Sequence, residues 1–278
     1  MNELESNIIN IYGDRGKVWL DDLPEIIRKL EVKWDLSDLT PVQNLSFNYV
    51  LTGFQNEKPI VLKVGLDENT LMREAAALTV LKNTGAVQIL AQDKGVILLE
   101  RVVPGTSLKG FFPDNDTQAI RIVCGVMRRL HQASVTPVHN FPHIRDWLLV
   151  LDKNWDMPTH YLEKARKLRD RLLQTSAEPV LLHGDLHHDN ILRQGKTDWV
   201  VIDPKGVIGY PLNEIWAFIM DIERDTKFVA DCFSFDVQEV RDCYFVHVVM
   251  AACWTLEDNG EPGLFIALAE KAHQLLSK

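Results

Sequence analysis

The chain changes character at Pro104-Gly105, and this break limits the folds open to it more than any other feature of the sequence. Before the break, short β-like segments are joined by turns. Beyond it, helical periodicity dominates, in segments near 116–133, 143–152, 160–175, 236–258 and 264–276. The pattern predicts an α+β protein with an N-terminal lobe over residues 1–102 and a C-terminal lobe over residues 103–278.

Within each lobe, shorter signals predict individual elements. The acidic start and proline of 21–24 predict a helix that runs to about Leu30, and apolar residues on one face predict another over 69–82. The β-like segments of the N-terminal lobe are 46–54, 59–64, 86–92 and 95–101. A β-rich island, 180–193 and 199–203, interrupts the helical lobe.

Composition and charge exclude several classes of protein. The longest apolar stretches have about ten residues, about half of what a membrane span needs. The first ten residues carry no signal-peptide pattern, so we expect a cytoplasmic protein with no membrane partner. The four cysteines have no C-x-x-C spacing and are interpreted as reduced core residues. The net charge is −9, whereas a nucleic-acid binder needs a basic face, so no nucleic-acid partner is expected.

The segment 183–190, HGDLHHDN, carries the most chemistry. Six of its eight side chains can bind a metal or exchange a proton, and apolar runs flank it on both sides. Asp203 follows another apolar strand, at the kind of position where α/β sites are usually built. Phosphoryl transfer needs a base beside the attacking hydroxyl and oxygen ligands for Mg²⁺. Asp185 fits the base, and Asn190, five residues later, fits a metal ligand together with Asp203.

The N-terminal lobe offers an independent test of this hypothesis. Phosphoryl transfer of this kind also needs a strand lysine that pairs with a helix glutamate. Lys63 lies inside an apolar strand, and Glu74 follows eleven residues later in the predicted helix. A lysine flanked by Leu62 and Val64 is costly to bury without a partner. The alternative is that Lys63 extends to solvent from an edge strand while Glu74 lies on a solvated helix face.

Several stretches of the chain resemble one known family. HGDLHHDNIL, WVVIDPKGVIGYP, VLKVG, REAAAL and ILLERVVPG are similar to segments of the aminoglycoside/hydroxyurea antibiotic resistance kinases, the group that contains streptomycin 6-kinase. The resemblance extends from about residue 18 to residue 255. It implies a two-lobed protein-kinase-like fold, with a small antiparallel sheet in the N-terminal lobe and a larger, mainly helical C-terminal lobe.

The resemblance also implies cofactors and roles. ATP would lie in the cleft between the lobes, with the backbone of the connector from Glu100 to Val102 facing the adenine. Asp185 would be the base, and Asn190 and Asp203 would hold Mg²⁺. Lys63 and Glu74 would position the phosphates. The product would be a small molecule phosphorylated on a hydroxyl, with an aminoglycoside such as streptomycin as the expected acceptor.

The expected phosphate loop, 44–49, departs from protein kinases because it contains no glycine. Glycines let backbone amides approach phosphates closely, so the side chains of Ser46 and Asn48 are expected to substitute for them. No A-P-E signature follows Asp203 either, which favours a small-molecule acceptor over a protein substrate.

Charge indicates the kind of acceptor. Residues 207–278 hold 12 acidic and 5 basic side chains, a net charge of −7, and two acidic clusters lie there, 221–225 and 257–261. A cationic acceptor is therefore expected. Three alternatives remain: a kinase of another small alcohol of the sugar, choline or homoserine type, a metal-dependent hydrolase built on the His/Asp segment, and a nucleotide-binding module without catalysis.

Overall fold

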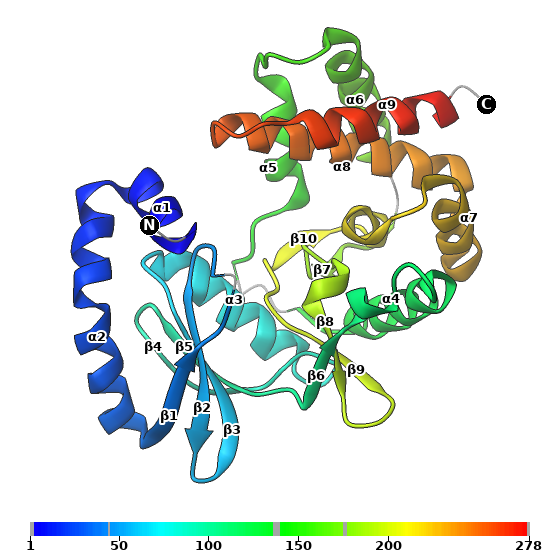
Figure 1. Ribbon diagram of the computed structural model, residues 1–278. Coiled ribbons are helices and arrows are strands. Elements are labelled where there is room, and N and C mark those ends of the chain that lie inside the picture. The colour runs from blue at the N-terminus through cyan, green and yellow to red at the C-terminus, as the bar shows by residue number, and fades with distance from the viewer. Residues whose placement is uncertain (1–2, 44, 136–139, 175–176, 277–278) are drawn as a thin grey trace.

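The computed structural model describes residues 3–43, 45–135, 140–174 and 177–276 and shows two lobes (Figure 1). The N-terminal lobe contains a five-stranded antiparallel sheet in the order β1-β2-β3-β5-β4. Its strands are β1 (Leu36–Pro41), β2 (Tyr49–Gln55), β3 (Lys58–Val64), β4 (Ile89–Asp93) and β5 (Val96–Glu100). Its helices are α1 (Glu3–Tyr12), α2 (Asp14–Trp34) and α3 (Glu68–Leu81).

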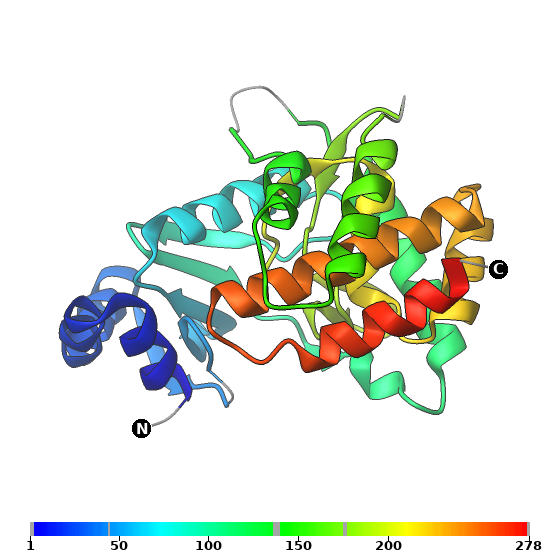
Figure 2. The same ribbon diagram turned by 90° about the horizontal axis from the view of Figure 1, so that it is seen from above.

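Helices cover both faces of this sheet, as Figure 2 shows from above. Successive side chains of a strand point to opposite faces, and β5 shows the consequence. Val96 and Leu98 pack with apolar residues of α1 and α2, among them Trp19. Ile97 and Leu99 instead join α3 and the apolar core of the C-terminal lobe. The sheet therefore has one core of its own and shares a second core with the other lobe.

The C-terminal lobe is mainly helical and is built around α8, most of whose residues are buried. Its helices are α4 (Asp116–Leu130), α5 (Ile144–Leu148), α6 (Thr159–Leu172), α7 (Ile222–Phe233), α8 (Val237–Glu257) and α9 (Gly263–Leu276). Its 3-10 turns are η1 (Leu108–Phe111), η3 (Leu149–Asp152), η4 (His188–Asn190) and η5 (Pro211–Phe218).

Two small sheets in the C-terminal lobe position the polar segment. β7 (Val180–Leu182) pairs with β10 (Val207–Gly209). β8 (Ile191–Gln194) lies between β6 (Pro104–Ser107) and β9 (Asp198–Val201). Because β6 pairs with β8 and not with the five-stranded sheet, we propose the boundary between the lobes at Val102–Val103. Among the described residues, no helix combines the length and the apolarity needed to cross a membrane.

The α+β, two-lobed fold class is confirmed, but the elements at the N-terminus correct the prediction. The expected helix start at Asp21 is wrong, because α2 begins at Asp14 and Pro24 lies inside it. The helix continues through the proline because Trp19, Leu23 and Leu30 form a buried face that packs on the sheet. The sequence patterns also missed α1, β1 and α7, while the predicted helix at 69–82 agrees with α3 to within one residue.

Candidate active site

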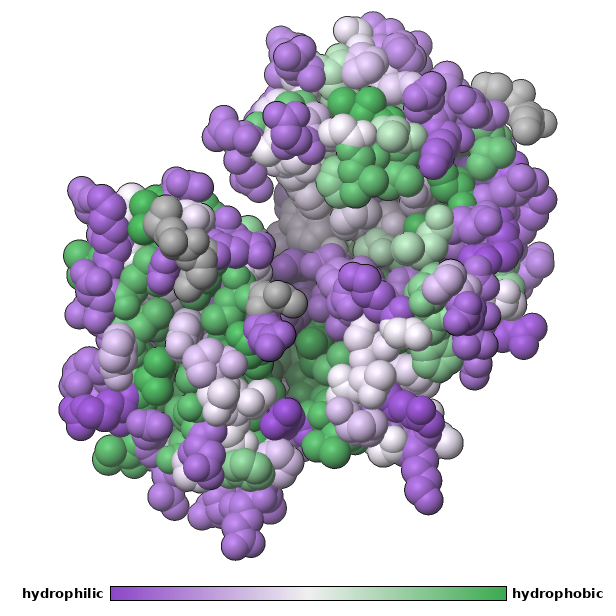
Figure 3. Space-filling view, viewed as in Figure 1, coloured by the Kyte–Doolittle hydropathy of each residue, from purple (hydrophilic) through white to green (hydrophobic). Residues whose placement is uncertain are grey.

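A groove separates the two lobes, and Figure 3 shows it as a hollow between the N-terminal lobe on the left and the helical lobe on the right. It contains a cavity of about 450 Å³. Strands of the five-stranded sheet form one wall, the connector after β5 forms the end, and residues of the C-terminal lobe close the other side. Six of the residues singled out from the sequence line this cavity: Ser46, Asn48, Lys63, Glu100, Val102 and Asp203.

Three charged side chains from different elements meet at one end of the cavity. The Nζ atom of Lys63, on β3, lies 2.7 Å from Oε2 of Glu74 on α3 and 3.1 Å from Oδ1 of Asp203. Lys63 and Glu74 are buried, each with 5% of its surface exposed, so the proposed edge-strand alternative for Lys63 does not apply. β3 lies between β2 and β5 in the interior of the sheet.

The electrostatics of this trio follow from burial and mutual proximity. Burial alone would lower the pKa of Lys63, but the carboxylates of Asp203 and Glu74 raise it above its ordinary value. Desolvation acts to raise the pKa of Asp203, yet the Lys63 ammonium holds it below its usual range. For Glu74, burial outweighs Lys63 and raises the pKa. The trio is therefore built around a permanently cationic lysine.

Asp185 lies on a loop that hydrogen bonds hold in place. The ring of buried His183 sits 2.8 Å from the Ile202 carbonyl through Nε2, and its Nδ1 accepts from the Asp185 N–H at 3.3 Å. This pair of contacts requires a neutral ring with its proton on Nε2, and burial lowers the pKa of His183 accordingly. The Asp185 side chain does not line the cavity described above; 27% of it is exposed, and its Oδ2 lies 3.7 Å from Nζ of Lys205.

Glu214 holds the same loop through the loop's backbone N–H groups. The sequence patterns did not single this residue out. This buried residue of η5 accepts hydrogen bonds from the N–H groups of His183 and Gly184, at 2.6 and 2.9 Å. Nε2 of His131 lies 3.5 Å from Oε2 of Glu214, the same oxygen that accepts from the His183 N–H. Burial acts to raise the pKa of Glu214, but the hydrogen bond and charge of His131 lead the effects that hold it below its ordinary value. An acid inside the apolar stretch PLNEIWAF was the only available signal.

Asn190 and Asp203 fit the chemistry of a magnesium site. The Asn190 side-chain N–H₂ donates to the Asp185 carbonyl at 2.9 Å, and within the described part of the chain its Oδ1 has no hydrogen-bond donor. The Ile202 N–H donates to the Asn190 carbonyl at 3.0 Å, so the segment before Asp203 is tied to Asn190. An amide oxygen and a carboxylate are hard oxygen donors, the kind that Mg²⁺ prefers.

The other polar side chains of the segment diverge from one another. Burial lowers the pKa of His188 to about 4, and its ring packs edge-on against Phe112. Asp189 accepts from Lys109 at 2.9 Å and from Ser107 at 3.1 Å. Across the described ranges, no three His, Cys, Asp or Glu side chains are grouped closely enough to hold a metal ion.

The phosphate loop and the connector differ in which of their polar groups already have hydrogen-bond partners. Among the described residues the Val102 N–H has no hydrogen-bond partner, whereas the Glu100 side chain accepts from the Gln88 N–H at 3.1 Å. The Ser46 carbonyl accepts from Asn7 of α1 at 3.0 Å. The Oδ1 atom of Asn48 is so close to Gly65 that a Cβ there would lie 2.3 Å from it. Asn44, the expected first residue of the loop, lies outside the described residues.

Several proteins that are similar to this chain in sequence or in fold are small-molecule kinases. The chain is 30% identical over 167 residues to streptomycin 3''-kinase of Klebsiella pneumoniae, a match that covers 58% of this chain and 60% of that protein. It is 24% identical to streptomycin 6-kinase of Streptomyces glaucescens, covering 92% of this chain and 90% of the relative. A solved aminoglycoside phosphotransferase, in a ternary complex with ADP and hygromycin B, superposes with a TM-score of 0.69 at 14% identity, covering 90% of this chain and 96% of that one.

The extent of the match to a family model shows which family the chain belongs to. The family model described as aminoglycoside/hydroxyurea antibiotic resistance kinase matches residues 34–235, which include every polar residue of the site from Lys63 to Glu214. The matched range spans most of both lobes. The chain therefore belongs to the aminoglycoside/hydroxyurea antibiotic resistance kinases and is a small-molecule phosphotransferase.

Proposed function

We propose that the protein transfers the terminal phosphate of ATP, with Mg²⁺, to a hydroxyl of an aminoglycoside of the streptomycin type. One observation carries the proposal: Lys63, Glu74 and Asp203 meet at the cavity, and the residue before Asp203 is hydrogen-bonded to Asn190, whose side chain holds the Asp185 carbonyl. A lysine, a loop acid and two oxygen ligands in this arrangement are the parts that phosphoryl transfer requires. The streptomycin kinases among the relatives favour the acceptor class.

The apolar part of the cavity suits the adenine of ATP. It is lined by aliphatic side chains from the sheet and from the C-terminal lobe, namely Val42, Val50, Val61, Val87, Leu99, Leu192 and Ile202. At its end, the free N–H of Val102 is a donor for a ring nitrogen of the base. The triphosphate would then extend toward Lys63 and Asp203, which line the same cavity. The related phosphotransferase solved with ADP agrees with nucleotide use.

The loop residues account for the chemical step. Asn190 and Asp203 would hold Mg²⁺, which supplies charge neutralisation on the phosphate oxygens when it is bound. Asp185 accepts the proton of the acceptor hydroxyl as that oxygen forms its bond to the γ-phosphorus. The bond from the γ-phosphorus to the β–γ bridging oxygen breaks, so that ADP and a phosphate ester result. Lys63 and its partner Glu74 keep the phosphates in line with the attacking oxygen.

Lys63 and Glu74 should behave as one functional unit. We expect Lys63→Ala to lower kcat/KM for ATP by about 10²-fold, on the scale of a lost buried donor, and Glu74→Ala to lower it less. Steady-state kinetics of both single variants and of the double variant would check this. A double variant no worse than Lys63→Ala fits a shared role, and additive losses would show that the two residues act separately.

The acceptor side of the groove is marked by a chain of contacts from the catalytic loop. A Cβ on Gly184 would lie 2.9 Å from Cη2 of Trp147, so this ring lies against the loop. Trp147 in turn packs edge-on against Trp254, with the ring centroids 5.4 Å apart. Trp254 is near the end of α8, and the turn from α8 to α9 lies on the groove side of the helical lobe (Figure 1).

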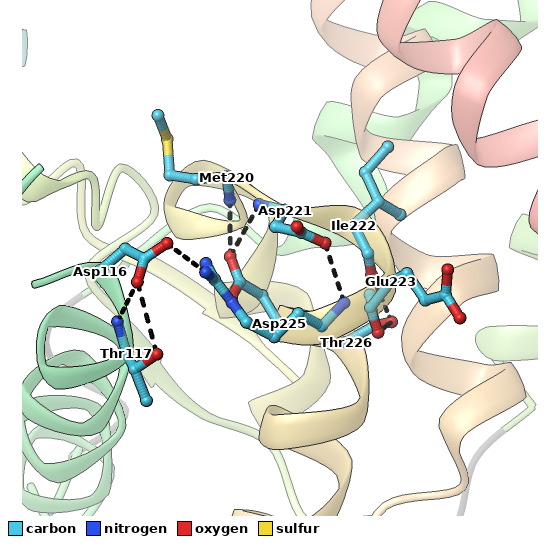
Figure 4. Close-up of polar contacts among 9 residues, drawn as sticks. Asp116, Thr117, Met220, Asp221, Ile222, Glu223, Asp225 and Thr226 are labelled. Atoms are coloured by element: carbon cyan, nitrogen blue, oxygen red, sulfur yellow. Dashed lines mark hydrogen bonds and ion pairs between the residues drawn. The ribbon is translucent and has the colours of Figure 1, made fainter. Parts of the chain in front are cut away.

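The two acidic clusters of the C-terminal lobe have different roles. In Figure 4, Asp225 is buried and accepts from the backbone N–H groups of Met220 and Asp221, both at 2.9 Å. Asp221 caps α7 by accepting from the Arg224 N–H, and Arg224 pairs with Asp225. The expectation that this cluster binds a cationic acceptor is not supported, because its charges are used to build the start of α7. α7 also lies at the opposite end of α8 from the groove (Figure 1).

The second cluster remains as the candidate for a cationic acceptor. Glu257 pairs with Lys153, whereas Asp258 and Glu261 are exposed in the turn after α8. We expect the double variant Asp258→Asn, Glu261→Gln to raise the KM for a cationic acceptor several-fold and to leave the KM for ATP unchanged. Kinetics at low and high salt would check this. The matched control is Asp231→Asn, a change at an exposed residue of α7. An unchanged acceptor KM would remove the cluster from the site.

A substrate screen tests the proposed function. ATP consumption would be measured with streptomycin, other aminoglycosides, choline, a sugar and homoserine, each with and without Mg²⁺. Mass spectrometry of the product would show the addition of one phosphate. Phosphorylation of streptomycin at a rate far above that of the neutral alcohols supports the proposal. Phosphorylation of only choline, the sugar or homoserine would transfer the assignment to a metabolite kinase.

A further inference from the structure

Lys205 has a position that the roles described so far do not use. It follows Asp203 by two residues, and its own N–H donates to the His183 carbonyl at 2.8 Å. Its Nζ lies 3.7 Å from Oδ2 of Asp185, and 51% of its side chain is exposed. Gly206, next in the chain, has a φ of +64°, and a Cβ there would lie 2.9 Å from the Cβ of Ala77. The backbone on both sides of Lys205 is therefore fixed by the catalytic loop and by α3.

A second cavity places this ammonium beyond the nucleotide's phosphate end. The cavity measures about 270 Å³ and shares Ser46, Asn48, Lys63 and Asp203 with the nucleotide cavity, so the two adjoin at the charged trio. Lys205 also lines it. A triphosphate that runs past Lys63 and Asp203 would carry its terminal phosphate toward this space.

The two lysines at this end differ in how their charges are used. The Lys63 ammonium lies within 3.1 Å of both Glu74 and Asp203, so two carboxylates balance it. For Lys205, the carboxylate at ion-pair distance among the described residues is that of Asp185, at 3.7 Å, longer than a hydrogen bond. Lys205 thus retains donors that can face a third group bound beside Asp185.

The phosphate loop increases the need for such a donor. Its sequence has no glycine, and the Ser46 carbonyl is held by Asn7 of α1. The side-chain oxygen of Asn48 is packed against Gly65. The loop therefore lacks the glycines that let backbone amides of the N-terminal lobe approach the phosphates closely. A cation from the C-terminal lobe can supply a hydrogen-bond donor instead.

We propose that Lys205 is a catalytic residue that contacts the transferred phosphoryl group. This inference rests on the proposed function. As the bond from the γ-phosphorus to the bridging oxygen breaks and the bond to the acceptor oxygen forms, negative charge is spread over the equatorial oxygens. The Lys205 ammonium donates to one of them while Asp185, beside it, takes the acceptor's proton. Lys205 keeps all its own protons, so the reaction stays balanced as ATP plus alcohol to ADP plus phosphate ester.

The test compares Lys205→Gln, Lys205→Arg and the control Lys196→Gln, a lysine exposed in the β8–β9 turn. We expect Lys205→Gln to lower kcat about 10- to 30-fold, less than a buried donor would, while the KM for ATP changes by less than about twofold. Lys205→Arg should recover most of kcat, and Lys196→Gln should match wild type. Melting temperatures of all three should stay close to that of wild type.

A binding measurement separates contact with the phosphoryl group from an indirect effect. Calorimetric titration would measure the affinity for ADP alone and for ADP with Mg²⁺ and aluminium fluoride, which mimics the transferred phosphoryl group. Lys205→Gln should lower the affinity for the aluminium fluoride complex, whereas ADP alone should bind as in wild type. Equal loss for both ligands, or wild-type kcat in Lys205→Gln, would overturn the inference. If instead wild-type protein phosphorylates none of the screened acceptors, the proposed function fails first, and the two failures are thus distinguishable.

Discussion

Asparagine in place of Asp185 is expected to lower turnover by about 10²- to 10⁴-fold, the range for loss of a positioned general base. Asparagine has nearly the same shape as aspartate but cannot take the acceptor's proton. The contacts that hold the loop use the backbone of residue 185, whose N–H meets His183 and whose carbonyl accepts from Asn190. Folding and nucleotide binding should therefore remain close to wild type, so the loss falls on kcat.

The matched control is Asp189→Asn, four residues away. Asp189 is tied to Lys109 and Ser107, and so its loss should leave turnover nearly unchanged. Turnover with a confirmed acceptor, together with ATP titration and thermal unfolding, would be measured for both variants. Wild-type turnover in Asp185→Asn would show that the base lies elsewhere.

Alanine in place of Asp203 is expected to abolish Mg²⁺-dependent nucleotide binding. The change removes the proposed metal ligand and also one of the two carboxylates that balance the buried Lys63. Asn190→Ala should reduce turnover more than binding, because Asn190 also fixes the Asp185 carbonyl. Because Asp203 has a φ of +59°, Asp203→Asn is the better second variant, since asparagine tolerates this backbone conformation.

Titration of an ATP analogue at several Mg²⁺ concentrations would check both assignments. For Asp203→Ala, the Mg²⁺ dependence should disappear, and Asp203→Asn should require far more Mg²⁺. Asn190→Ala should still bind nucleotide but turn over slowly. Wild-type Mg²⁺ dependence in all three variants would rule out Asn190 and Asp203 as ligands.

Local sequence patterns predicted the parts of the site that have fixed spacing. The five-residue step from Asp185 to Asn190 spans one loop and one 3-10 turn, and the structure ties the two residues together. The step from Lys63 to Glu74 spans the end of β3 and the first turns of α3, and these side chains meet. In both cases the geometry is set by short segments whose periodicity can be read directly.

The parts that were missed depend on contacts between distant segments. Glu214 reaches His183 across 31 residues, and its place inside the apolar stretch PLNEIWAF was a weak signal that did not indicate its partner. Asp225 belonged to the first acidic cluster expected to meet a cationic acceptor, but tertiary packing buries it. Pro24 signalled a helix start because local preference does not record the buried face that α2 forms on the sheet. Tertiary contacts decided each of these positions.

The packing of α3 has a consequence for how activity can be controlled. In protein kinases, the helix that carries the glutamate moves, and its position switches the enzyme on or off. Here Leu71, Leu78 and Leu81 of α3 lie in one apolar core that also includes buried residues of the C-terminal lobe. Moving the helix away would expose these side chains to water, with a free-energy cost of about 1.5–3 kcal/mol for each. We therefore expect α3 to stay in place, so that activity follows the amount of protein and substrate; a progress curve that starts without a lag would check this.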